Sequence, residues 1–104
     1  REYPMPKVVM YTTNICPYCV RAKALLHKKG VSYEERRIEG NRDFMREMLE
    51  RSKRRTVPQI FIDDYHVGGY ENLAELNAFG KLDELLGLQP EDSPGVTQEE
   101  ADPT

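Results

Sequence analysis

The tetrapeptide Cys16-Pro17-Tyr18-Cys19 decides the fold expected for this chain. It holds the only two cysteines, and it lies between a short apolar run and a pattern typical of a helix. Pro17 suits the first position of a helix, where the N–H group that proline lacks would have no partner. Two thiols at this spacing can close a small disulfide ring and open it again. Because so short a loop constrains the unfolded chain little, the pair is predicted to be redox-active rather than structural.

The helix expected after Cys16 gives its thiol a special environment. A helix N-terminus presents unpaired N–H groups and the positive end of the macrodipole, which favour a thiolate. A thiolate is the attacking species in disulfide exchange. We therefore expect Cys16 to be the nucleophile, with its sulfur open to water. Cys19, one turn later and more buried, is expected to attack Cys16 and release the product.

Two other interpretations of the cysteines are less favoured. A buried and inert pair is common for free cysteines, but it does not explain a proline at the helix start. A zinc site needs four ligands, and only the distant His27 and His66 could join the two thiols. No metal is therefore expected.

Hydrophobic patterning around the motif predicts alternating strands and helices. Strands are expected over 7–11, 31–38, 59–62 and 65–67. Helices are expected over 17–29, from an N-cap at Asn41 to about residue 52, over 71–79, and in a short segment around Leu82–Leu86. The β-α-β opening implies two parallel strands with a right-handed crossover, and the later hairpin adds antiparallel strands. The predicted class is α/β, with a four-stranded mixed sheet flanked by helices.

Helical periodicity also predicts which side chains face the core. The set comprises Val20, Ala24, Leu25 and Leu26 in the first helix, Phe44, Met45, Met48 and Leu49 in the second, and Leu73, Leu76 and Phe79 in the third.

Length and charge bound the remaining possibilities. The 104 residues suffice for one domain, which we place at residues 5–88, and residues 89–104 are expected to form a disordered acidic tail. Up to residue 88 there are 15 basic and 13 acidic residues, a mild excess that suits small anions better than nucleic acid. No apolar stretch approaches the ~20 residues that span a bilayer. The absence of a recognisable signal peptide predicts a cytoplasmic protein.

Three motifs resemble those of the glutaredoxin family. Besides the Cys-Pro-Tyr-Cys motif, they are Thr56-Val57-Pro58 before the third strand and Gly68-Gly69-Tyr70 before the third helix. Their order and separation resemble the bacterial dithiol members, and the likeness runs from about residue 7 to residue 88. This resemblance implies a thioredoxin fold in which Pro58 is a cis proline beside the cysteines. It also implies a glutathione groove between the cysteine helix and the strand at Val57.

The resemblance assigns one wall of this groove to the residues around the cis proline. Tyr18 would line the groove, and the backbone of Val57, beside Pro58, would pair with glutathione like a strand. Arg54 and Thr56 would lie near the glycyl carboxylate.

The other wall would come from the third helix. The N–H groups of Glu71 and Asn72 would hold the γ-glutamyl carboxylate, and Gly69 would let the backbone approach closely. Two positions depart from the family pattern, which often has a lysine at Thr13 and an acid at Asn72. Each missing charge pair is worth only about 0–1 kcal/mol, so weaker glutathione binding is expected without a change of function.

The function implied by the resemblance is glutathione-dependent reduction of protein disulfides and of glutathione mixed disulfides. The implied partners are glutathione and disulfide-containing or glutathionylated proteins, with ribonucleotide reductase as one possible client, and the implied state is a monomer. Two alternatives stay open: a dimer that binds an iron–sulfur cluster through Cys16 and glutathione, and an electron donor served by thioredoxin reductase. Pro17 stiffens the site against the first, and Gly68-Gly69 before a polar helix start favours glutathione over the second.

Overall fold

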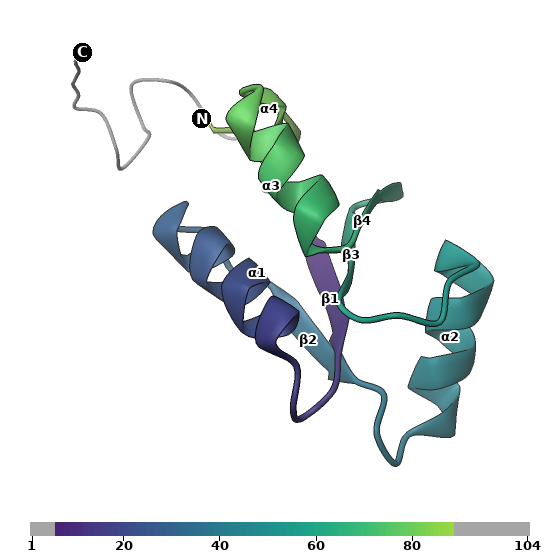
Figure 1. The fold of residues 1–104 in the computed structure, drawn as a ribbon. Helices are drawn as coiled ribbons and strands as arrows, with labels where there is room; N and C mark the ends of the chain where they lie inside the picture. The colour runs from purple at the N-terminus through teal and green to yellow at the C-terminus, as the bar shows by residue number, and fades with distance from the viewer. Residues whose placement is uncertain (1–5, 89–104) are drawn as a thin grey trace.

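The computed structural model describes residues 6–88 as four strands and four helices (Figure 1). The strands are β1 Val8–Thr12, β2 Glu34–Arg37, β3 Gln59–Ile62 and β4 Tyr65–Gly68, and the helices are α1 Pro17–Lys28, α2 Arg42–Ser52, α3 Tyr70–Ala78 and α4 Lys81–Leu85. This order confirms the predicted α/β class. The expected tail at 89–104 lies outside the described residues.

The sheet has the strand order β2-β1-β3-β4 and is mixed, as predicted. β1 pairs in parallel with β2, where Met10 faces Glu35, and antiparallel with β3, where Met10 faces Ile60. β4 returns antiparallel to β3. Every residue of β1 is buried, because this strand lies inside the sheet with a neighbour on each side.

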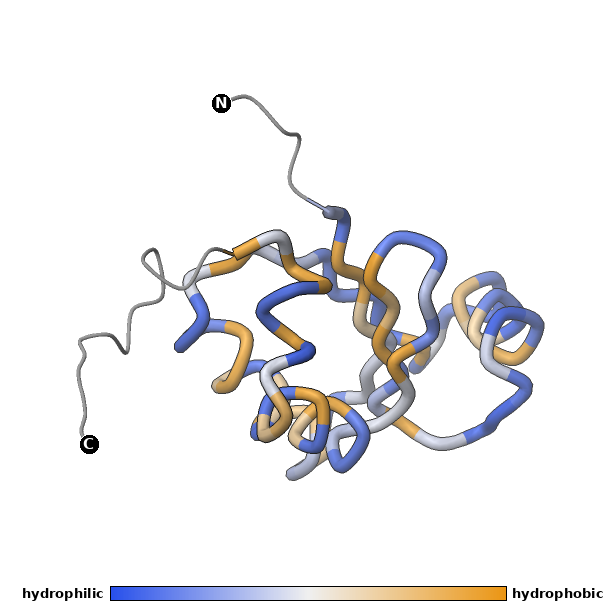
Figure 2. The backbone as a smooth tube through the Cα atoms, turned by 90° about the horizontal axis from the view of Figure 1, so that it is seen from above, coloured by the Kyte–Doolittle hydropathy of each residue, from blue (hydrophilic) through white to orange (hydrophobic). Residues whose placement is uncertain are grey.

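Helices cover both faces of the sheet, and the alternation along β1 separates two cores. Met10 packs with residues of α1, α3 and α4, such as Leu26 and Leu73. Tyr11 points the other way and packs with Met48 of α2 and with other residues of the second core. Figure 1 shows α2 across the sheet from α1 and α3. In Figure 2, hydrophobic segments of the chain (orange) run through the middle of the molecule.

The predicted inner face of α1 is partly wrong. Val20 is 63% exposed and Ala24 is also exposed, whereas Cys19, Ala22 and Leu26 are buried. The reason lies at the start of the helix. Once Cys19 turns inward, the residues three and seven positions later share its face, and Val20 is rotated outward.

Two further side chains are wrongly assigned to the core. Met45 is exposed on α2, and Phe79 is 74% exposed. Phe79 caps the C-terminus of α3 and so lies beyond its last helical turn. The remaining predicted inner residues of α2 and α3 are buried or half-buried.

The strand β2 is shorter than predicted. The expected strand at 31–38 is reduced to Glu34–Arg37, because Val31 closes the end of α1 by donating its N–H to the carbonyl of Leu26. The four residues of β2 are charged, as suits a strand at the edge of a sheet.

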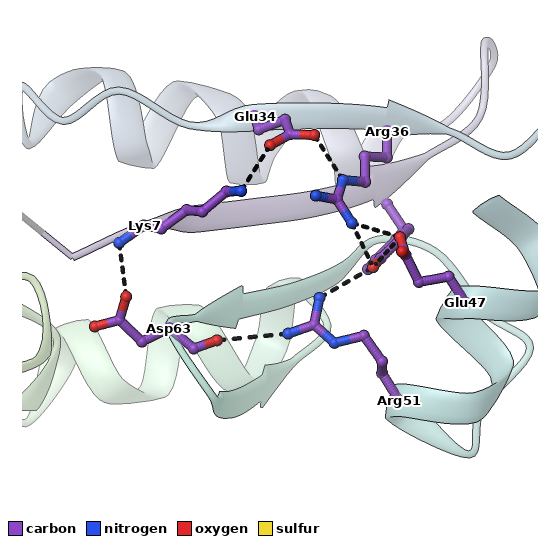
Figure 3. A network of polar contacts seen from close by, with 7 residues as sticks. Lys7, Glu34, Arg36, Glu47, Arg51 and Asp63 are labelled. Atoms are coloured by element: carbon purple, nitrogen blue, oxygen red, sulfur yellow. Dashed lines mark hydrogen bonds and ion pairs between the residues drawn. The ribbon is translucent and has the colours of Figure 1, made fainter.

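A polar cluster fastens α2 to the sheet (Figure 3). The buried hydroxyl of Tyr11 donates to Glu47 at 2.7 Å and accepts from Arg51 at 3.0 Å and from Arg36 at 3.3 Å. Burial and the Glu47 hydrogen bond together raise the pKa of Tyr11. Because one donor and two acceptor positions are all used, this phenol is fully satisfied inside the protein.

The longest helix within residues 6–88 is α1, whose 12 residues are too few to cross a bilayer.

Candidate active site

The cysteines lie at the N-terminus of α1. Cys16 is the N-cap residue in an extended conformation, and Pro17 occupies the first turn, as predicted. The N–H of Cys19 donates to the sulfur of Cys16 at 3.1 Å. The two cysteines form a disulfide with their Cα atoms 5.1 Å apart. The helix start therefore directs a backbone N–H group at the sulfur of Cys16, where it would favour a thiolate after reduction.

The two cysteine residues differ in exposure, though less than expected. Cys16 is 8% exposed and Cys19 is 1% exposed. The order agrees with the prediction, but Cys16 is far less open in this disulfide state. Its sulfur lies 3.9 Å from the carbonyl oxygen of Val57, which covers one side. Because a disulfide sulfur carries no hydrogen, this approach is a packing contact rather than a hydrogen bond.

The peptide bond between Val57 and Pro58 is cis, as the resemblance implied. Pro58 is buried immediately before β3, and Val57, which lies beside the disulfide, is half-buried. The loop at 53–58 therefore forms a wall next to the cysteines.

A groove of about 390 Å³ lies beside this wall. All eight residues that the resemblance assigned to glutathione line it, together with Tyr70: they are Tyr18, Arg54, Thr56, Val57, Pro58, Gly69, Glu71 and Asn72. Positions from α1, from the loop before β3 and from the start of α3 thus converge on one cavity. The structure brings the predicted residues together, while their roles toward a ligand stay predictions.

Tyr70 is the lining residue that the sequence analysis missed. Its ring stacks on that of Tyr18, with centroids 6.4 Å apart and an interplanar angle of 26°. The guanidinium of Arg21 lies 5.3 Å from the centroid of Tyr18 on the same helix. The signal was available, because Tyr70 belongs to the Gly-Gly-Tyr motif, but its contact with Tyr18 depends on tertiary structure.

The fold itself requires a glycine at Gly68, while the close approach of glutathione to the backbone of Gly69 stays a prediction. A Cβ at Gly69 would lie 3.6 Å from the carbonyl oxygen of Pro58, an ordinary contact. Gly68 has a φ of +112°, and a Cβ there would overlap the side chain of Asn72. The amide oxygen of Asn72 accepts the N–H of Gly69 at 3.0 Å and lies 3.4 Å from Arg54. Asn72 therefore caps α3 and joins the two walls of the groove.

The comparisons with known proteins give a consistent assignment. The glutaredoxin family model matches residues 8–67, more than half of the chain. The chain belongs to the glutaredoxin family. Among its relatives, glutaredoxin 3 of Escherichia coli is 56% identical over 82 residues, 79% of this chain and 99% of the relative. A glutaredoxin of Pseudomonas aeruginosa is 49% identical over 79% of this chain and 98% of its own length.

Solved glutaredoxin structures agree with the fold. The solution structure of glutaredoxin from Brucella melitensis has a TM-score of 0.70 at 50% identity, over 79% of this chain and 89% of the other. The crystal structure of a buckwheat glutaredoxin–glutathione complex has a TM-score of 0.72 at 29% identity, over 79% of this chain and 77% of the other. This glutaredoxin therefore has the thioredoxin fold, and it is a glutathione-dependent thiol–disulfide oxidoreductase.

Metal-binding side chains do not gather in residues 6–88: no three or more His, Cys, Asp or Glu form a cluster there. Of the three hypotheses from the sequence, the family assignment favours the oxidoreductase over the iron–sulfur dimer and the thioredoxin reductase partner.

Proposed function

We propose that Cys16 is the nucleophile of this glutaredoxin and that Cys19 is the resolving thiol. The observation that carries this proposal is the hydrogen bond from the Cys19 N–H to the sulfur of Cys16. It stabilises negative charge on that sulfur, and the peptide dipoles of α1 add to the effect. Cys19 is the more buried of the two, which suits a thiol that attacks only its neighbour.

A protein disulfide is reduced in two exchange steps. The Cys16 thiolate attacks one sulfur of the client, the client S–S bond breaks, and the other client sulfur leaves as a thiolate. The Cys19 thiolate then attacks the Cys16 sulfur of the mixed disulfide and releases the second client sulfur. The client gains two electrons, and the enzyme is left with the Cys16–Cys19 disulfide seen here. Two glutathione thiolates restore the dithiol and form glutathione disulfide.

A glutathione mixed disulfide needs only Cys16. The Cys16 thiolate attacks the glutathione sulfur of the glutathionylated client. The client protein leaves as a thiolate, and glutathione stays bound to Cys16 as a mixed disulfide. A second glutathione thiolate attacks the glutathione sulfur of this mixed disulfide, which yields glutathione disulfide and frees Cys16. Cys19 takes no part in this route.

The groove supports glutathione as the tripeptide held beside Cys16. Arg54 and Thr56 offer a guanidinium and a hydroxyl for the glycyl carboxylate, and Val57 offers backbone groups for strand-like pairing. The first-turn N–H groups of Glu71 and Asn72 suit the γ-glutamyl carboxylate. Tyr18 supplies an apolar surface between the two ends.

The protein substrates that we propose are disulfide-containing and glutathionylated proteins of the cytoplasm, with ribonucleotide reductase as one client. We propose a monomer, which is supported by the fact that one chain provides both cysteines and every lining residue of the groove. Sedimentation of the reduced protein and reduction of purified ribonucleotide reductase test these two assignments.

Two serine variants test the cysteine roles. Cys16→Ser removes the attacking sulfur, so both reduction of a protein disulfide and release of glutathione from a glutathionylated peptide should stop. Cys19→Ser should retain release of glutathione and lose most of the reduction of protein disulfides. Both activities are measured in one coupled assay with glutathione, glutathione reductase and NADPH. Activity of Cys16→Ser with either substrate would contradict the assignment.

A further inference from the structure

A fully buried amide connects the groove wall to the edge of the sheet. Gln59, the first residue of β3, is 0% exposed and does not line the groove. Its side-chain nitrogen lies 3.0 Å from the carbonyl oxygen of Thr56 and 3.1 Å from the hydroxyl of Thr56. Its amide oxygen lies 2.7 Å from Nε2 of His66 on β4. Every hydrogen-bonding atom of this amide therefore contacts a neighbour.

The chemistry of the neighbours fixes the orientation of the Gln59 amide. The carbonyl of Thr56 can only accept, so the NH₂ group must face Thr56 and the amide oxygen must face His66. Nε2 of His66 must then carry a hydrogen. It carries one in both the Nε2–H tautomer and the imidazolium ion, so the contact survives titration of His66. Burial, Arg54 and Arg51 lower the pKa of His66 and favour its neutral form.

This orientation has a consequence for the hydroxyl of Thr56. The NH₂ group of Gln59 can only donate, and its nitrogen lies within hydrogen-bond distance of both the carbonyl oxygen and the hydroxyl oxygen of Thr56, so this hydroxyl acts as an acceptor. The hydroxyl hydrogen of Thr56 is therefore left to point away from Gln59. Thr56 is exposed and lines the groove, so this side chain offers a donor to an acceptor such as a carboxylate.

The same loop is fixed at its other end by a second buried polar residue. The hydroxyl of Ser52 accepts the N–H of Arg54 at 3.0 Å and lies 2.7 Å from the carbonyl of Met48. Lys53, which lies between Ser52 and Arg54, has a left-handed φ of 62°. Buried side chains thus hold the loop on both sides of the residues that line the groove, and Gln59 holds the end nearer to Cys16.

We propose that Gln59 is a positioning residue for glutathione recognition, which holds the backbone and hydroxyl of Thr56 so that the hydroxyl donates into the groove. His66 fixes the amide of Gln59 from the far side. This inference rests on the proposed function, in which Thr56 lines the glutathione site. Gln59 itself does not line the groove, and its side chain hydrogen-bonds to Thr56 and His66 rather than to a cysteine, so it acts on binding of the tripeptide and not on the exchange of sulfurs.

The test is Gln59→Met, which keeps the length of the side chain and removes its hydrogen bonds. KM for a glutathionylated peptide should rise about three- to tenfold, the loss expected for one hydrogen bond. kcat should stay within about twofold, as should the rate at which dithiothreitol reduces the Cys16–Cys19 disulfide. Tyr11→Phe is the control, because it also removes a buried hydrogen-bonding group from the same face of the sheet, and none of the hydrogen-bond partners of Tyr11 lines the groove. Its KM should not change.

Two more variants separate positioning from general loss of stability. His66→Phe keeps an aromatic ring beside Phe61 and removes the donor to Gln59, so a smaller rise in KM is expected. This variant also tests the inference if Gln59→Met does not fold. In a Thr56→Val background, Gln59→Met should raise KM by a smaller factor than in the native protein, since the hydroxyl that it orients is gone.

The results distinguish this inference from the proposed function. If Arg54→Met and Thr56→Val raise KM but Gln59→Met and His66→Phe do not, the inference is wrong and the groove assignment stands. Two other results would also overturn it. One is a fall in kcat of Gln59→Met at unchanged KM, and the other is a rise in KM by the same factor whether or not the Thr56 hydroxyl is present. If Arg54→Met and Thr56→Val leave KM unchanged, the groove assignment itself fails.

Discussion

At the scale of single residues, two neighbouring arginines differ in their place around the groove. Arg54 lines it and lies 3.4 Å from Asn72 on the opposite wall. Arg55 is exposed and is not among the lining residues. Only the family resemblance distinguished Arg54 from Arg55, because the charge pattern of the basic run at 53–55 also suits the negative end of the α2 dipole.

This difference predicts unequal effects of two matched substitutions. Arg54→Met keeps an aliphatic chain and removes the charge, so KM for a glutathionylated peptide should rise severalfold at unchanged kcat. The rise is modest because an exposed charge pair contributes about 1 kcal/mol or less. Arg55→Met serves as the control with the same loss of net charge. Equal effects of both variants would mean that only the general positive charge of the loop matters.

At the scale of elements, α2 is held on the sheet by ionic groups as well as by apolar packing. Glu47 of α2 contacts Tyr11 of β1 and Arg36 of β2, so one carboxylate joins three elements (Figure 3). The hydrogen bond from Tyr11, with further help from Arg36, lowers the pKa of Glu47 despite partial burial.

The lowered pKa of Glu47 predicts a loss of stability in acid. A carboxyl with a lower pKa in the folded state stabilises the protein above its ordinary pKa of 4.5, and this contribution is lost as the pH falls through the folded value. Glu47→Gln should therefore reduce the free energy of unfolding at pH 7, on the order of 0.5 kcal/mol given its partial exposure. It should have less effect near pH 3.

Urea unfolding between pH 3 and pH 7 measures this contribution. Glu50→Gln, an exposed position on the same helix, is the control and should change the profile little. A Glu47→Gln profile parallel to that of the native protein at every pH would contradict the account.

At the scale of the whole molecule, the order of strands and helices could be predicted from local patterns alone. Gly30, the Asn41 cap and the cysteine motif are local signals, and the structure has an element boundary at each. The inner face of α1 was misjudged because Val20 is apolar and the rotation of the helix is set by Cys19 turning inward. The shortening of β2 came from a contact across the end of α1.

The groove was predictable only through resemblance, because its residues are far apart in the chain. Thr56, Asn72 and Tyr18 carry no common local pattern that places them around one cavity. The link from His66 through Gln59 to Thr56 and the stacking of Tyr70 depend on side chains that meet after folding. Hydrophobic periodicity does not encode such polar contacts.

The most direct test concerns the sulfur at the start of α1. In the reduced protein, the rate of alkylation of Cys16 by iodoacetamide should already be near its plateau at pH 7, because the Cys19 N–H and the helix dipole stabilise the thiolate. Mass spectrometry assigns the modified cysteine, and Cys19→Ser provides a single-thiol background. A rate that keeps rising through about pH 8.5, as for a free cysteine, or alkylation confined to Cys19 would contradict the account.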